Sequence, residues 1–99
     1  MDKKFLNRIE KEINHQFALK NLKVKKIKFF GSAEFDDFKN INDIDVVIIS
    51  DNFNDISFIE RSKLTRGIHL KMVEKFNKPF DMIYLSTKEW KNKNLLIGF

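Results

Sequence analysis

The segment "NDIDVVIIS", residues 42–50, limits the possible folds more than any other part of the chain. Its apolar run, Val46–Ile49, consists of β-branched residues and is far too short to cross a membrane, so it predicts a buried strand over Asp43–Ile49. Because side chains alternate between the faces of a strand, Asp43 and Asp45 point to the same side, with Cα atoms about 7 Å apart. The sequence therefore places two carboxylates together where a buried strand begins.

Apolar periodicity and capping patterns predict the other elements. Apolar residues recur every four positions over about Lys3–Lys20, which is typical of an amphipathic helix, and the β-forming segment Leu22–Phe30 follows. Capping-box spacing at Ser57 begins a second apolar stripe, which predicts one long helix that continues through Gly67 to Phe76. The expected order is helix 3–20, strand 22–30, strand 43–49, helix 57–76, strand 80–85 and a short helix 86–90.

A third carboxylate lies in the last predicted strand, Phe80–Leu85. If this strand pairs with the strand of Asp43 and Asp45, Asp81 joins them on the same face. Two carboxylates about 5 Å apart repel by roughly 3 kcal/mol at an effective dielectric of about 20, so three of them take up protons or bind a divalent cation. Oxygen-only ligation favours Mg²⁺ or Mn²⁺. Two simpler interpretations stay open, namely that Asp43 is a turn residue and that Asp81 faces solvent from an edge strand.

Gly31 and Ser32 follow the first predicted strand. A glycine there lets the backbone approach a phosphate closely, and the serine hydroxyl adds a hydrogen-bond donor. This pair is a candidate for binding the phosphates of a nucleotide, although it also fits an ordinary turn.

In this order and spacing the motifs resemble those of the DNA polymerase β-like nucleotidyltransferase superfamily, in particular its short, antitoxin-type minimal nucleotidyltransferases. The segments "FFGS", "NDIDVVII" and "PFDMIYL" carry the resemblance, which extends over Lys28–Leu85. It implies that Gly31 and Ser32 hold the nucleotide phosphates, that Asp43 and Asp45 bind metal ions, and that Asp81 serves as base or third metal ligand. The expected fold is α/β (α+β), a small mixed β-sheet in one domain over residues 1–99, with helices on one face and the carboxylates on the other.

The function that this resemblance implies is a metal-dependent transfer of a nucleoside monophosphate, AMP from ATP, to a hydroxyl of a partner protein. The protein would act as the antitoxin of a toxin–antitoxin pair with a helical, toxin-like partner. Ala33, Glu34, Phe35 and Asp36 stand where the family often has a basic residue and a glycine, so an inactive binding protein with the same fold is one alternative. A small basic RNA-binding module is the other.

Composition bounds these alternatives. A formal net charge of +5 is compatible with a polyanionic partner, but the lysines are spread along the sequence and no strand shows an RNP-like aromatic pattern, so nucleic-acid binding is not expected. The absence of cysteine excludes disulfides and thiolate metal sites. Since the start, "MDKKFLNRIEKE", lacks the apolar segment of a signal peptide, we expect a cytoplasmic protein without membrane segments.

Other conspicuous residues have simpler interpretations. His15 and His69 have no second histidine or cysteine at ligand spacing, so neither is assigned to the site. Three basic residues of the second long helix fit a solvated face better than a substrate clamp: Arg61, Lys63 and Arg66. Because only a short segment follows the third strand, we expect the acceptor to be held by another molecule. The apolar residues of this segment, Trp90 and Leu95–Phe99, therefore form either a docking surface for a partner protein or second copy, or part of the core.

Overall fold

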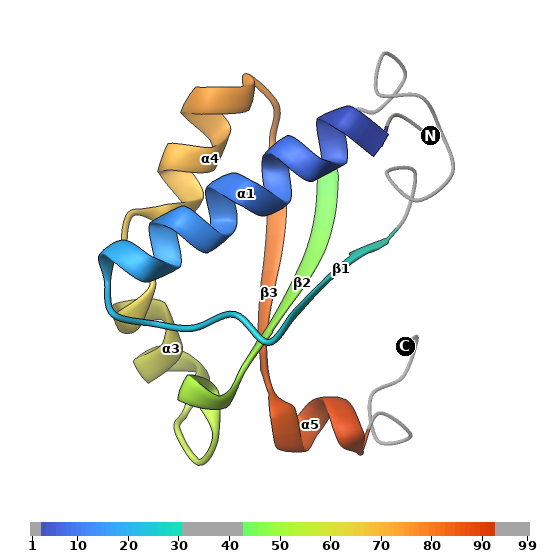
Figure 1. The fold of residues 1–99 in the computed structure, drawn as a ribbon. Coiled ribbons are helices and arrows are strands. Elements are labelled where there is room, and N and C mark those ends of the chain that lie inside the picture. The colour runs from blue at the N-terminus through green and yellow to red at the C-terminus, as the bar shows by residue number, and fades with distance from the viewer. Residues whose placement is uncertain (1–2, 31–42, 93–99) are drawn as a thin grey trace.

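The computed structural model describes residues 3–30 and 43–92 of the 99-residue chain (Figure 1). Gly31, Ser32 and Leu95–Phe99, singled out by the sequence, lie outside the described residues. In chain order the elements are α1 (Lys3–Leu19), β1 (Lys26–Phe30), β2 (Ile44–Ser50), the 3₁₀ turn η2 (Asp51–Phe53), α3 (Phe58–Leu64), α4 (Ile68–Phe76), β3 (Phe80–Ser86) and α5 (Thr87–Lys91). No helix within these ranges is long and apolar enough to cross a membrane.

The three strands form one mixed sheet with β2 at its centre. β1 runs antiparallel to β2, and β3 runs parallel to it, so the expected mixed sheet is confirmed. A parallel pair cannot be joined by a tight turn, and the connection from β2 to β3 accordingly contains η2, α3 and α4.

The apolar run of β2 is continuous because both faces of this strand are buried. Ile44, Val46 and Ile48 belong to the main core, which α1 and α4 cover (Figure 1). Val47 and Ile49 point to the opposite face, where they pack with a second, smaller apolar group. That group contains Phe30, Leu85 and Trp90.

Helix α5 refines the expectation that helices pack on one face. α1 and α4 cover the main face, whereas α5 brings Trp90 against the second apolar group on the other side of the sheet. Ser86 begins α5 with a complete capping box in which Glu89 takes part, as its spacing in the sequence predicts. Trp90 is therefore half-buried against its own sheet, and the rest of the apolar set proposed for docking, Leu95–Phe99, lies outside the described residues.

The predicted helix over residues 57–76 is wrong in one respect, because it is two helices. α3 ends at Leu64 and α4 begins at Ile68, and Gly67 between them has φ +88°. This left-handed conformation is incompatible with a continuous helix and is readily adopted only by glycine. Ser57 nevertheless caps α3, since its side chain accepts a hydrogen bond from the backbone N–H of Glu60.

Arg61 is also not on a solvated helix face, since it is 5% exposed. Its guanidinium donates to the carbonyl oxygens of Ile56 and Tyr84 and lies 2.6 Å from Oε1 of Glu89. The ring centroids of Phe53 and Phe58 lie 5.9 and 4.6 Å from Cζ of the Arg61 guanidinium. Arg61 therefore joins α3 to β3 and α5, and sequence spacing alone does not distinguish it from its exposed neighbours.

Replacing Arg61 by methionine should lower the free energy of unfolding by about 3 kcal/mol, because it leaves a carboxylate and two carbonyl groups without their donor. The exposed Arg66 offers a matched control, and Arg66→Met should change stability by less than about 0.5 kcal/mol. Urea denaturation of both variants measures the difference. Equal stability of the two variants would contradict a structural role for Arg61.

Stability should also depend on the protonation of Glu89. Burial alone raises the pKa of Glu89, but hydrogen bonds from Arg61 and Ser86 outweigh it and hold the pKa below the ordinary value of 4.5. The stabilisation that the ionised Glu89 gives the folded state is therefore complete above about pH 4.5. It is lost as the pH falls through the lowered folded-state pKa of Glu89. In urea titrations, the stability difference between wild type and Glu89→Gln should shrink with falling pH below this point. A difference that stays constant down to about pH 3 would contradict this assignment.

Candidate metal centre

The site begins with the register of β2 and β3. In this parallel pair Asp45 is the direct partner of Asp81, so both carboxylates leave neighbouring strands at the same level of the sheet. Asp43 precedes β2 by one residue and lies two positions before Asp45, which places it on the same side. The three aspartates that the sequence singles out are therefore brought together by strand pairing.

One carboxylate oxygen from each of Asp43, Asp45 and Asp81 lies within 4.8 Å of the others. Asp43 and Asp45 are half-buried, whereas Asp81 is exposed. The cluster shares the sheet face of Val47 and Ile49, opposite the face that α1 and α4 cover. This cluster is the one group of three or more potential ligand residues found among the described residues, and it includes neither His15 nor His69.

Asp45 has an electrostatic environment that disfavours its charge. Burial raises its pKa above the ordinary value of 3.8, and a hydrogen bond with Asp81 and the charges of Asp43 and Asp81 raise it further. A group of carboxylates held in this way gains stability when a cation or a proton joins it. The oxygen donors match the preference of Mg²⁺ and Mn²⁺ for hard ligands.

A hollow of about 500 Å³ lies between α4 and the edge strand β3, and Asp81 is the one member of the cluster that lines it. Asp81 forms part of its wall, together with His69, Val73, Lys78, Pro79 and Phe80. His69 donates from Nε2 to the carbonyl oxygen of Phe80 at 2.7 Å, which connects α4 to the edge of β3. Sequence reasoning did not identify this hollow, because it arises only when the turn between α4 and β3 is folded.

Comparison with known families gives the decisive observation. The family model described as "Nucleotidyltransferase domain" matches residues 6–96, which is nearly the whole chain. The chain belongs to the nucleotidyltransferase domain family. Neither curated proteins nor solved structures give a match.

Membership of this family agrees with the resemblance found in the motifs. A nucleotidyltransferase domain transfers a nucleoside monophosphate, and enzymes of this type use a nucleoside triphosphate and a divalent metal ion. The aspartate cluster of this nucleotidyltransferase domain has the donor atoms that such an ion needs. Gly31 and Ser32, the candidates for phosphate binding, lie outside the described residues.

The raised pKa of Asp45 predicts a stabilising substitution. A folded-state pKa above the unfolded one means that stability is lost as the pH rises through it, so at neutral pH the Asp45 charge destabilises the metal-free protein. Asp45→Asn should therefore raise the melting temperature by a few degrees in the presence of a chelator. Asp55, exposed and paired with Lys88, provides the control, and Asp55→Asn should give no increase. A lower melting temperature for Asp45→Asn would contradict the electrostatic account.

Proposed function

We propose that Asp43, Asp45 and Asp81 bind Mg²⁺ or Mn²⁺ and that the protein transfers AMP from ATP to a hydroxyl group of another molecule. The observation that supports this most is the convergence of three carboxylates within 4.8 Å in a chain of the nucleotidyltransferase domain family. The cluster would not suffice alone, because exposed acidic groups often lie together without a metal. The family match would not suffice alone either, because it names no metal-binding residues.

The spacing of the carboxylates fits such an ion. Octahedral Mg²⁺ holds its ligand oxygens about 2.1 Å from the metal, which puts neighbouring oxygens about 3 Å and opposite ones about 4 Å apart. Oxygens already within 4.8 Å of one another reach these distances through small side-chain rotations. When bound, the metal would neutralise charge on the triphosphate and on the leaving pyrophosphate.

Asp81 is the member of the cluster best placed to act on an acceptor. It is exposed and lines the hollow beside β3, whereas Asp43 and Asp45 are half-buried and do not line that hollow. An acceptor hydroxyl in this hollow would lie next to the Asp81 carboxylate, which takes up the hydroxyl proton as the oxygen attacks the α-phosphorus. The new P–O bond forms as the bond to pyrophosphate breaks. Asp43 and Asp45 keep the triphosphate and its metal in position.

We further propose that the acceptor belongs to a partner protein, as in a toxin–antitoxin pair. The resemblance to antitoxin-type minimal nucleotidyltransferases supports this proposal. The hollow at Asp81 supports it as well, since an open surface hollow admits a side chain of another protein. The acidic residues Glu34 and Asp36 favour the second candidate, a protein that binds nucleotide without transferring it.

Calorimetry with ATP tests the proposed site. Wild type should show heat of binding that depends on Mg²⁺, and Asp45→Asn should abolish it because the cluster loses a ligand. Asp55→Asn removes the same charge outside the cluster and should bind like wild type. Equal heat from wild type and Asp45→Asn would exclude the cluster as the nucleotide site.

Release of pyrophosphate separates the two candidates. With ATP, Mg²⁺ and a hydroxyl-bearing partner protein, the transferring enzyme should release pyrophosphate and increase the partner's mass by one AMP moiety. Binding by calorimetry without either product, for every partner tried, would favour the inactive binding protein.

A further inference from the structure

The outward face of α1 carries three cationic side chains in a row. Lys4, Arg8 and Lys11 are spaced four and three residues apart, so they lie on one side of the helix and span about 10 Å along its axis. The buried residues of α1, such as Ile9 and Ile13, lie on the opposite side. We name these three residues the basic stripe.

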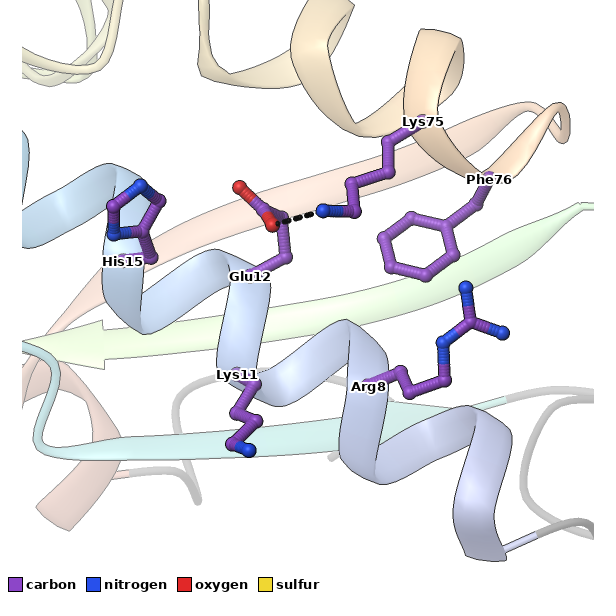
Figure 2. A pocket seen from close by; sticks show the side chains of 6 residues that line it. All are labelled: Arg8, Lys11, Glu12, His15, Lys75 and Phe76. Atoms are coloured by element: carbon purple, nitrogen blue, oxygen red, sulfur yellow. Dashed lines mark ion pairs between the residues drawn. The ribbon is translucent and has the colours of Figure 1, made fainter.

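The basic stripe borders two adjoining hollows, one between α1 and α4 and one along the exposed surface of α1. One, of about 380 Å³, is lined by Arg8, Lys11, Glu12, His15, Lys75 and Phe76 (Figure 2). The other, of about 630 Å³, is lined by Lys4, Asn7, Arg8, Glu10, Lys11 and Asn14. Because Arg8 and Lys11 line both hollows, the two form one groove around the stripe.

Arg8 is held in a position that suits an anion. Its guanidinium lies over the ring of Phe76, 5.6 Å from the centroid, and Figure 2 shows the side chain extended toward that ring. This cation–π contact uses none of the guanidinium N–H groups, which stay available for a bidentate contact with a phosphate. Arg61 differs, because its donors are used by two carbonyl groups and Glu89.

Two carboxylates, Glu10 and Glu12, line the groove, and neither forms an ion pair with the stripe. Glu12 lies 2.8 Å from Nζ of Lys75 and also accepts a hydrogen bond from Gln16, so its charge is already paired (Figure 2). Within the described ranges, Lys4, Arg8 and Lys11 take part in no ion pair. The stripe is thus a row of three cations that form no ion pair with the described residues, and Glu10 is the carboxylate beside them that is not held by another cation.

We propose that the basic stripe binds consecutive phosphates of a single-stranded nucleic acid. Its length of about 10 Å exceeds that of one phosphate group, and a flexible single strand can follow the row of cations along α1. Phe76 is covered by Arg8 and packs against Phe5 and Phe80, so it offers no open ring for base stacking. Contacts to phosphates without base contacts give binding that is strong at low salt and independent of sequence.

The stripe is separate from the proposed metal centre. α1 covers the sheet face of Ile44 and Val46, whereas Asp45 belongs to the opposite face. A strand on α1 therefore leaves the carboxylate cluster free. This function is additional to nucleotide transfer, and its test does not require that transfer occurs.

Fluorescence anisotropy with a labelled oligo-uridylate of about twelve nucleotides tests this proposal on the full chain. Three phosphate contacts predict a slope of about −2 for the logarithm of the association constant against the logarithm of salt concentration, at about 0.7 per contact. Arg8→Gln and Lys11→Gln should each weaken binding at least threefold at about 50 mM salt and flatten the slope by about 0.7. An oligo-deoxythymidylate of the same length should bind with comparable affinity.

Three further variants separate this site from general electrostatic attraction. Lys63→Gln on α3 removes an equal charge outside the groove and should change affinity by less than about 1.5-fold. Glu12→Gln releases Lys75 and removes a negative charge, so it should tighten binding, which a purely structural role of Glu12 does not predict. Asp45→Asn should bind the strand like wild type.

Several outcomes would overturn the proposal. The first is absence of binding at low salt, and the second is equal weakening by Arg8→Gln and Lys63→Gln, which indicates diffuse attraction to a basic protein. Loss of binding in Asp45→Asn would place the strand at the carboxylate cluster instead. Inorganic tripolyphosphate provides a last comparison. If it displaces the labelled strand as effectively, per phosphate, as unlabelled oligonucleotide does, the groove binds free polyphosphate instead.

Discussion

Hydrogen bonding between β2 and β3 in one parallel register constrains both the core and the carboxylate cluster. Asp45 pairs with Asp81, while Ile44 and Val46 point to the opposite face and fill the space under α1 and α4. A shift of β3 by one residue would turn Asp81 toward that apolar core, where an unpaired carboxylate is strongly unfavourable. The same apolar packing that stabilises the sheet therefore keeps the acidic side chains together on the other face.

Much of this arrangement can be predicted from the sequence, because it depends on periodicities of two and four residues. The alternation around Asp43 and Asp45 gives the strand and its acidic face, and the position of Asp81 in "PFDMIYL" gives the third carboxylate. The burial of Arg61 is not predictable in this way, since it depends on how α3 meets β3 and α5, and the apolar stripe that continues across Gly67 hides the break between α3 and α4. Gly31 and Ser32 remain predictions.

One group of carboxylates and one row of cations lie on opposite sides of the sheet. Three carboxylates gather on one side, while Lys4, Arg8 and Lys11 lie on the outer surface of the helix that covers the other. The lysines look evenly spread when the sequence is read linearly, but helical spacing collects part of them into one row. Net charge alone therefore gives little information about where an anionic ligand binds.

The long connection between the parallel strands has a consequence for how the chain folds. β1 and β2 are neighbours in sequence, whereas β3 pairs with β2 only after η2, α3 and α4 have been placed. Closing such a long segment costs chain entropy before its contacts form, so we expect β3 to join the sheet late. Asp81 reaches Asp45 only at that step. Intermediates in which β3 has not yet docked would lack the complete cluster, and only the finished fold would present all three carboxylates together.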